Sequence, residues 1–340
     1  MRKLLNTLYI TTPESYLSKD GLNFVVSVNQ NEIFRIPILN IESVVTFGYM
    51  GASPGVMKLC AENGVSLTFL SPNGRFVSRV QGPIKGNVLL RKKQYQLSDD
   101  RIYAMHLSQL FIGGKIQNYR NILRRFIRDY GTNSEVEDAA SVLMMRKKEL
   151  LRAKDLDQLR GIEGDAANVY FGVFSQLILN QNVDFVFKGR NRRPPKDAVN
   201  AMLSFAYTLI ANDVAAALET IGLDPYVGFL HSLRPGRISL ALDLMEEMRA
   251  YLGDRLVLSL INRKQISIKD FCMQGDEGIV MTDSARKIFL ATWQNRKKEL
   301  IIHPYLNEKV PIGLLPYIQA MLLARYMRGD LDDYPVFLIP

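Results

Sequence analysis

The hydrophobic period of this chain changes near residue 94, and this change restricts its possible folds more than any other feature. Before it, short runs rich in β-branched and aromatic residues are separated by Asp-Gly and Asn-Gly turn signals, which is the pattern of β-strands. These runs occupy residues 8–12, 23–28, 33–38, 43–47, 66–70 and 76–80. A short helix is predicted at about residues 54–62, because Pro54 opens this segment and Asn63-Gly64 follows it.

After the change, apolar residues recur every three or four positions, which is the spacing of amphipathic α-helices. Long stretches of this kind lie at about residues 134–153, 163–181, 195–220, 238–262, 282–300 and 311–328. The sequence therefore predicts an α+β chain. It would comprise a small N-terminal β-sheet domain over residues 1–90, a linker over 91–97 and a larger, all-helical domain over 98–340.

The chain is strongly basic, with 43 lysines and arginines against 34 aspartates and glutamates and a formal net charge of +9. This balance favours association with an anionic polymer or a membrane surface. No apolar run approaches the roughly 20 residues that span a bilayer, so we expect no membrane. Nucleic acid is the expected polyanion.

Cysteine usage and missing motifs exclude several other classes of protein. Cys60 and Cys272 lie far apart and form no disulfide framework, which fits the cytoplasm. Polar Asn6 and Thr7 interrupt the N-terminal apolar stretch, so export is not expected. The sequence has no Gly-rich phosphate loop followed by Lys-Ser or Lys-Thr and no paired-cysteine motif, so ATP hydrolysis and zinc-finger DNA binding are not expected.

Two candidate metal ligands stand beside small or apolar residues. Glu163 lies in Gly161-Ile-Glu-Gly164, where we expect a loop to enter a helix. The alternative for Glu163 is a structural carboxylate favoured by the helix dipole. His231 ends the run Gly228-Phe-Leu-His, just after Asp224-Pro225, a helix-start signature. A hydrogen-bonded core histidine is the alternative for His231.

Three acids, Asp243, Glu246 and Glu247, lie on one predicted helix. On a helical wheel, Asp243 is expected in the middle of the polar face, Glu246 at its edge beside a half-buried cleft, and Glu247 at the opposite edge. Asp243 and Glu246 could converge on one cation, although three acids on a solvated face are also common. One imidazole with two carboxylates suits Mg²⁺ or Mn²⁺, which activates a hydroxyl and stabilises charge on phosphorus. The acids of this basic chain therefore indicate a metal-dependent enzyme acting on phosphodiesters.

Basic residues form four clusters, at residues 115–128, 146–148, 188–196 and 286–298. The third is the strongest candidate for DNA binding, because its prolines and glycine indicate a loop whose arginines can grip phosphates. A solvated positive face is the alternative for the other three. The expected DNA contacts are Lys188, Arg190, Arg192, Arg193, Lys196 and Arg249. Three aromatic residues could stack on bases or belong to the core: Tyr170, Tyr207 and Trp293.

Four ordered motifs resemble those of a known family: Gly161–Gly164, Lys188–Tyr207, Gly222–His231 and Leu242–Arg249. They are similar to the motifs of the CRISPR-associated adaptation integrase, the first and most widespread Cas protein family, which acquires spacers in antiviral defence. The similarity covers essentially the whole chain. The opening segment, Lys3–Thr11, resembles the subtype I-C branch of this family.

The resemblance implies an N-terminal β domain that forms a homodimer and a helical catalytic domain that binds Mg²⁺ or Mn²⁺. The family's metal ligands fall on Glu163, His231 and Glu246, with Asp243 as an accessory acid, and these four residues would form the catalytic set. Where the family motif continues Phe-Arg-Pro, this chain has Met248-Arg249-Ala250, which affects local packing rather than the ligand set. The sequence leaves open whether Asp243 or Glu247 supplies a further ligand.

The implied reaction is integration of short foreign DNA into a CRISPR array, in which a 3′-hydroxyl attacks a repeat phosphodiester on each strand. The same site would cut double-stranded or branched DNA with water as the nucleophile. The implied partners are these DNAs, the CRISPR repeat and leader, and a small second Cas protein that bridges two dimers. Two alternatives remain: a general metal-dependent DNA or RNA nuclease, and a non-catalytic nucleic-acid-binding scaffold.

Overall fold

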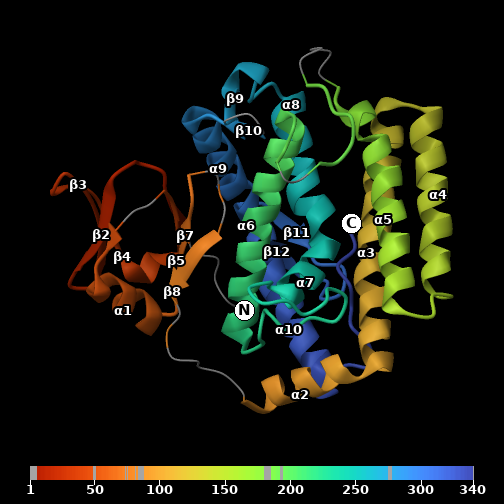
Figure 1. Cartoon of the computed structure of the whole chain (residues 1–340), viewed down its shortest axis with the longest axis horizontal. Helices are drawn as coiled ribbons and strands as arrows, with labels where there is room; N and C mark the ends of the chain where they lie inside the picture. Colours follow the sequence, from red (N-terminus) through yellow and green to blue (C-terminus); the bar gives the residue numbers. More distant parts are fainter. Residues whose placement is uncertain are drawn as a thin grey trace. The chain divides into compact units, whose positions relative to one another are not determined.

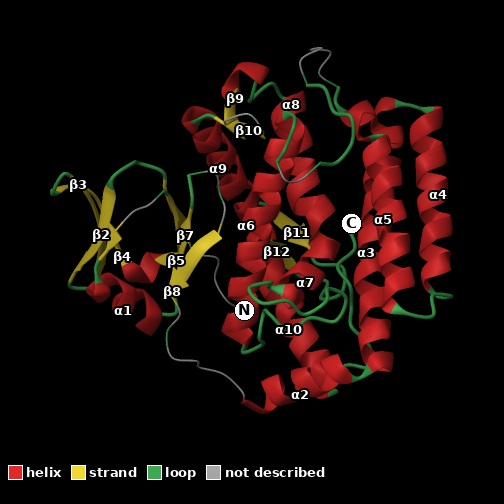
Figure 2. Cartoon of the chain, in the orientation of Figure 1, coloured by secondary structure: helices red, strands yellow, loops and turns green. Residues whose placement is uncertain are grey.

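The computed structural model describes residues 6–48, 51–72, 74, 76–80, 82, 88–179, 185–191, 194–274 and 278–339. The chain forms two compact units, and both are discontinuous in sequence. The first contains Met1–Lys85 and Met281–Glu299, and the second contains Gly86–Val280 and Leu300–Pro340. An N-terminal β-sheet region is followed by a mostly helical region, as predicted (Figure 1, Figure 2).

Two four-stranded sheets make up the described part of the β region. In one sheet, β1 (Asn6–Ile10), β5 (Ile41–Phe47) and β7 (Ser66–Leu70) run parallel, and β8 (Phe76–Val80) pairs antiparallel with β7. The other sheet has the order β4 (Asn31–Pro37), β3 (Asn23–Val28), β2 (Ser15–Asp20) and β6 (Gly51–Ala52). Its pairings are antiparallel except that of β2 with β6, which is parallel.

The predicted strands at 23–28, 66–70 and 76–80 coincide with β3, β7 and β8. Helix α1 (Pro54–Glu62) also lies where it is predicted, and Ser53 caps it by accepting a hydrogen bond from the Val56 amide. The sequence pattern does not reveal β2, because Ser-Tyr-Leu-Ser-Lys-Asp is largely polar. Pairing with β3 along its whole length forms this strand, and Leu17 at its centre is fully buried.

Helix α9 (Asp283–Lys298) belongs to the first unit, although the sequence analysis places it in the helical domain. It contacts β1, and the Lys297 ammonium lies 3.4 Å from the Thr7 hydroxyl. Trp293 is buried in α9 and is therefore a core residue rather than a platform for bases. A second difference concerns the predicted linker at 91–97, because these residues lie inside helix α2 (Val88–Asp99).

The second unit is built on long helices: α3 (Arg101–Tyr130), α4 (Ser134–Leu150), α5 (Leu156–Gly172), α6 (Ala198–Ile221), α7 (Ser239–Arg249), α8 (Arg255–Asn262) and α10 (Leu315–Arg328). Helix α3 packs against α4, α5 and α7, and α6 packs against α7 and α10 (Figure 1). Asp or Asn side chains cap the N-termini of α3, α4, α5 and α6. The helices thus bring distant segments of the chain beside α7.

Short strands interrupt the helical region, which is therefore not entirely helical. Strand β9 (Phe271–Gln274) pairs with β10 (Gly278–Met281), and β11 (Leu300–Ile302) pairs with β12 (Lys309–Pro311). Each strand has only three or four residues, which is too short for a clear alternating pattern in the sequence.

Helix α6 is, among the described residues, the one helix long and apolar enough to cross a membrane. The sequence predicts no such segment, because no apolar run approaches the roughly 20 residues that span a bilayer. In the structure 72% of its most apolar window is buried against the rest of the protein, which is typical of a central core helix.

A π-helix, Ala250–Asp254, joins α7 to α8 where the sequence predicts one helix over 238–262. A π turn shifts the faces of the helix on either side of it. Asp254 is fully buried and accepts a 2.5 Å hydrogen bond from the Tyr207 hydroxyl. Burial raises the pKa of Asp254 to about 6, although the Tyr207 hydrogen bond and the Arg249 charge oppose this rise.

This raised pKa predicts a pH-dependent effect of Asp254→Asn on stability. The carboxyl group contributes fully to stability below its ordinary pKa of 3.8, and this contribution is lost as the pH rises through about 6. The amide keeps the neutral shape at every pH. We therefore expect the free energy of unfolding of Asp254→Asn, relative to the wild type, to rise by about 2 kcal/mol between about pH 4 and about pH 8. Urea unfolding measures this difference.

Asp138→Asn is the matched control, because Asp138 is an exposed acid on α4. It should show no comparable relative gain with pH. Parallel pH profiles of Asp254→Asn and the wild type would contradict the assignment of a raised pKa to Asp254.

Candidate active site

Glu163 lies in the middle of α5 and not at a helix start, which corrects the sequence prediction. The helix begins at Leu156, and the Asp155 carboxylate caps it by accepting a hydrogen bond of 2.8 Å from the Gln158 amide. The helix-dipole explanation for Glu163 is therefore excluded, since the dipole effect is confined to the first turn. The next residue, Gly164, borders the pocket, because a Cβ at this position would have no atom within 4 Å.

His231 lies in the loop between α6 and α7, and no helix starts at Asp224-Pro225. The buried Gln94 side chain fixes this loop, because it donates to the Asp224 and Val227 carbonyls and accepts from the Asp224 amide. Gly228 is required by close packing, since a Cβ there would lie 2.6 Å from the Asp243 carboxylate. The segment predicted to start a helix at Asp224-Pro225 is thus a tightly packed loop that holds His231 at the pocket.

Asp243 is fully buried and does not lie on a solvated polar face. Its carboxylate accepts hydrogen bonds from the backbone amides of Phe229, Leu230 and His231 at 2.6, 3.0 and 3.0 Å. It also lies 2.6 Å from His231 Nδ1. A carboxylate at Nδ1 selects the tautomer in which Nδ1 donates, which leaves Nε2 as the acceptor. Asp243 therefore orients the imidazole.

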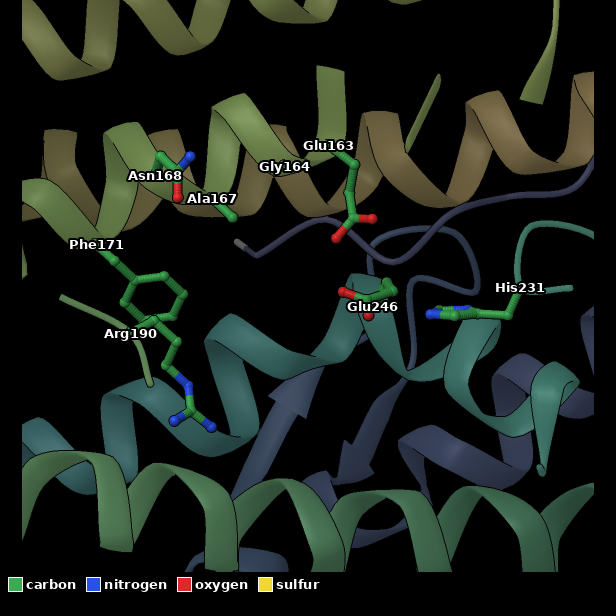
Figure 3. A pocket seen from close by; sticks show the side chains of 8 residues that line it. All are labelled: Glu163, Gly164, Ala167, Asn168, Phe171, Arg190, His231 and Glu246. Atoms are coloured by element: carbon green, nitrogen blue, oxygen red, sulfur yellow. The ribbon is translucent and has the colours of Figure 1, made fainter. Parts of the chain in front are cut away.

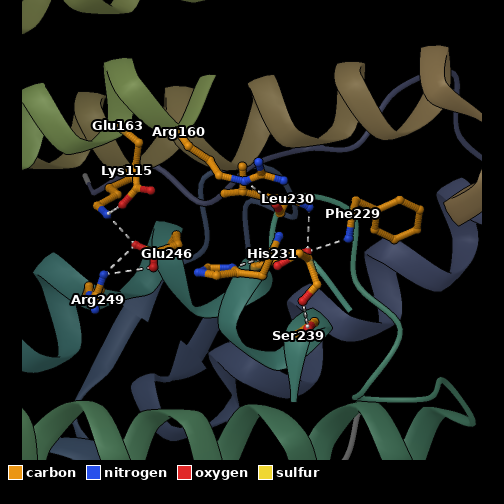
Figure 4. A network of polar contacts seen from close by, with 11 residues as sticks. Lys115, Arg160, Glu163, Phe229, Leu230, His231, Ser239, Glu246 and Arg249 are labelled. Carbon is orange, nitrogen blue, oxygen red and sulfur yellow. Dashed lines mark hydrogen bonds and ion pairs between the residues drawn. The ribbon is translucent and has the colours of Figure 1, made fainter. Parts of the chain in front are cut away.

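Glu246 is buried and surrounded by cations (Figure 4). Its two oxygens lie 2.8 and 2.7 Å from Arg249 Nη1, and its Oε2 lies 2.7 Å from Lys115 Nζ. Burial raises the pKa of Glu246, but the charges of Arg249 and Lys115 outweigh it and lower the pKa well below the usual range. Glu246 is therefore ionised at neutral pH.

Glu247 faces a different part of the unit. It accepts hydrogen bonds from the Tyr334 hydroxyl, the Gln319 amide and the Phe337 backbone amide at 2.5, 2.9 and 2.7 Å. Burial raises its pKa to about 7 against these hydrogen bonds. Both carboxylate oxygens of Glu247 accept hydrogen bonds from these groups, so Glu247 fixes the C-terminal segment. It does not face the candidate site.

Lys115 is a site residue that the sequence identified only as part of the basic cluster at 115–128. Its side chain is 1% exposed, and its ammonium lies 2.5 Å from Glu163 Oε1 and 2.7 Å from Glu246 Oε2. The sequence does hold a signal, because a single lysine follows Gly113-Gly114 within an apolar stretch. A Cβ on Gly114 would lie 2.2 Å from Val336, so α3 packs closely against the C-terminal segment just before this lysine.

Glu163, His231 and Glu246 line one pocket of about 290 Å³, together with Gly164, Ala167, Asn168, Phe171 and Arg190. Figure 3 shows the two carboxylates and the imidazole pointing toward one another from α5, the His231 loop and α7. The pocket thus joins residues far apart in the sequence. Its floor is acidic, and its far wall carries the Arg190 guanidinium.

The donor set of this pocket fits a divalent cation. Two carboxylates and one imidazole nitrogen suit Mg²⁺ or Mn²⁺, and the Lys115 ammonium already occupies a cation position between the carboxylates. Over the described part of the chain, however, no three His, Cys, Asp or Glu side chains stand close enough together to hold a metal ion. The three predicted ligands share a pocket, but in this arrangement Lys115 separates the two glutamates.

The predicted DNA contacts fall into different environments. Lys188 and Lys196 are exposed. Arg190 is half-buried and donates to Asn200 Oδ1 and Ser204 Oγ at 2.7 and 3.0 Å, so it fixes the loop to α6 at the wall of the pocket. Arg192 and Arg193 lie outside the described residues.

Arg249 does not lie on a DNA-binding surface. It is 8% exposed, is bound to Glu246, and its guanidinium lies 4.2 Å from the centre of the Tyr207 ring. The prediction of a DNA contact is wrong for this residue, since its charge is used inside the protein. Tyr170 and Tyr207 are likewise buried, and Tyr170 stacks on Tyr119 at a centroid distance of 3.8 Å, so both are core residues.

The sequence and the fold both match proteins of one family. The family model for CRISPR associated protein Cas1 matches residues 8–295. The CRISPR-associated endonuclease Cas1 1 of Chlorobaculum tepidum is 49% identical over 341 residues, which are 99% of each chain.

Two solved structures share the fold. A casposase bound to integration product has a TM-score of 0.84 and 21% identity, with 97% of this chain and 92% of that chain covered. A chain of a Cas6-RT-Cas1–Cas2 complex has a TM-score of 0.84 and 22% identity, with 99% and 36% covered.

The hydrogen bonds of Asp243 predict that Asp243→Ala destabilises the protein strongly. The substitution leaves three buried backbone amides without their acceptor, and each such loss costs about 1–3 kcal/mol. We expect the free energy of unfolding in urea to fall by at least about 3 kcal/mol. Asp224→Ala in the same loop is the control and should cost less, because Asp224 is partly exposed and accepts from the Tyr226 amide and the Tyr95 hydroxyl. Equal losses in both variants would contradict the assigned role of Asp243.

Proposed function

The chain belongs to the CRISPR-associated Cas1 family, and we propose that it is a divalent-metal-dependent DNA integrase and endonuclease that inserts short DNA into CRISPR arrays. The observation that carries the proposal is the pocket in which Glu163, Glu246 and His231 face one another. Its acids stand in a strongly basic protein, which favours a polyanionic substrate.

Glu163, Glu246 and His231 Nε2 would hold Mg²⁺ or Mn²⁺. When bound, the cation supplies charge stabilisation at phosphorus and activates the attacking hydroxyl. The buried Asp243 carboxylate keeps His231 Nδ1 protonated, so that Nε2 points into the pocket as an acceptor. Arg249 holds Glu246 through both oxygens and restricts its rotation. These residues preorganise the donors before DNA arrives.

The proposed reaction is a transesterification. A 3′-hydroxyl of the incoming DNA forms a new P–O bond with a repeat phosphodiester, and the old P–O3′ bond breaks. The departing 3′-oxygen takes up a proton, while the attacking hydroxyl loses one. With water as the attacking group, the same pocket would hydrolyse double-stranded or branched DNA.

Exposed Lys188 and Lys196 on the loop before α6 would hold the DNA backbone, with Arg190 at the pocket wall and Arg192 and Arg193 adding charge. Phosphate contacts of this kind position DNA without reading its sequence. The proposed partners are the CRISPR repeat and leader, a second copy of the chain paired through the β region, and a small second Cas protein. The shared fold with a DNA-bound casposase and with a Cas1–Cas2 complex supports these proposals. The expected location is the cytoplasm.

A strand-joining assay tests the function. The chain and its small Cas partner are incubated with a labelled donor duplex and a repeat-containing target, with and without Mn²⁺ or Mg²⁺. We expect joined products only with metal, and a loss of about a hundredfold or more for Glu163→Gln, His231→Ala and Glu246→Gln, since each removes a proposed metal ligand. His106→Ala is the control, because this exposed histidine pairs with Asp333 away from the pocket. Full joining by all three variants would exclude this site.

The same assay separates the alternative functions. A general nuclease would cut the target without joining it to the donor. It would cut the target as readily when the donor has a 3′-deoxy end as when it has a 3′-hydroxyl. A nucleic-acid-binding scaffold would bind both DNAs and change neither, with or without metal.

DNA affinity should depend steeply on salt, and Lys188→Ala and Lys196→Ala should each reduce that dependence. Each lysine that neutralises a phosphate contributes about 0.9 to the slope of log affinity against log salt concentration. Fluorescence anisotropy with a duplex at several salt concentrations measures the slope. Lys58→Ala, exposed on α1 beside Glu62, is the control with an unchanged slope. A slope unaffected by both loop variants would remove this loop from the DNA-binding surface.

A further inference from the structure

A single lysine lies between the two glutamates of the pocket (Figure 4). Lys115 Nζ is 2.5 Å from Glu163 Oε1 and 2.7 Å from Glu246 Oε2, and the Lys115 side chain is 1% exposed. Both distances are within the range of charge-assisted hydrogen bonds. The ammonium therefore bridges one carboxylate from α5 and one from α7, and the lysine itself comes from α3.

The two glutamates differ in how much they depend on this bridge. Glu246 is also held by Arg249 through both of its oxygens. Glu163 is 18% exposed, and Lys115 is its one ion-pair partner within the described residues. Removing the lysine charge would leave the Glu163 carboxylate facing Glu246 without a cation between them. Like charges at such short range repel strongly in a partly buried site.

A divalent cation bound between Glu163 Oε1 and Glu246 Oε2 would need the position that the Lys115 ammonium now occupies. The three predicted ligands line one pocket with the lysine between two of them, and the described residues include no three side chains placed to hold a metal ion. Two cations cannot both stand between the same carboxylate oxygens, because their mutual repulsion and the limited number of lone pairs oppose it.

We propose that Lys115 is a built-in counter-cation that holds Glu163 and Glu246 together before metal binds, and that metal binding takes at least one of these carboxylates from its ammonium. The proposal rests on the metal-dependent function proposed above. Lys115 thus acts as a positioning residue for the two glutamates and sets the metal affinity by competition. In the metal-free protein the Lys115 ammonium neutralises the acidic pocket.

Manganese binding to the full chain without DNA tests the proposal. The free Mn²⁺ signal in electron paramagnetic resonance gives the dissociation constant of the wild type, Lys115→Met and Lys147→Met. We expect Lys115→Met to bind Mn²⁺ about tenfold or more tightly, because both the competing ammonium and its repulsion are gone. Lys147→Met should bind as the wild type does, since Lys147 is a half-buried lysine that donates to neutral Gln117. The rise of Tm on adding Mn²⁺ should likewise be larger in Lys115→Met.

The outcomes separate this proposal from the function itself. If Mn²⁺ binds the wild type and Glu163→Gln weakens it, but Lys115→Met binds no more tightly than the wild type, the counter-cation role is wrong and the metal site stands. If Mn²⁺ binds neither the wild type nor Lys115→Met, the metal site and the counter-cation role both fall.

A crystal structure of the wild type with Mn²⁺ covers the case in which Lys115→Met does not fold. We expect Lys115 Nζ to lie beyond hydrogen-bond distance of at least one of Glu163 and Glu246. A pocket that holds Mn²⁺ on these glutamates while Nζ keeps both contacts would overturn the proposal.

Discussion

Three buried carboxylates on one stretch of α7 organise the larger unit, because a charge removed from water needs donors or cations nearby. Asp243 faces the amides of the His231 loop, Glu246 faces Lys115 and Arg249, and Glu247 faces the C-terminal segment. Each acid therefore fixes a different part of the chain against the same helix. Two of these attachments place the His231 loop and α3 beside α7, and Lys115 of α3 in turn contacts Glu163 on α5.

Charge neutralisation also reconciles an acidic pocket with the anionic substrate that we propose. Arg249 and Lys115 stand behind the pocket carboxylates, and Arg249 packs in turn on the Tyr207 ring. Tyr207 donates to Asp254, which the π-helix turns into the core. The irregular turn between α7 and α8 is thus linked by two contacts, through Tyr207, to Arg249, which holds Glu246. A π turn beside a functional site is a recurrent feature of helices.

Family membership and the pocket support the same function by separate routes. The relatives are CRISPR-associated endonucleases by name, and the shared fold extends to a casposase bound to integration product. Independently, the pocket offers two carboxylates and an oriented imidazole beside a loop with exposed lysines. Metal dependence, strand joining and the partner proteins are proposals that this chemistry supports.

The sequence alone determined the order of β and helical regions, most strand positions of the N-terminal β region, and the residue types of the pocket, because these follow from local periodicity and from motifs. Only the tertiary structure decided which charged residues are buried. A helical wheel placed Asp243 on the polar face, and nothing local to α7 reveals the loop whose backbone amides bury it. Only the tertiary structure shows that α9 packs against β1, nearly 300 residues earlier in the chain. The hydrophobic pattern of a segment does not indicate which distant segment it contacts.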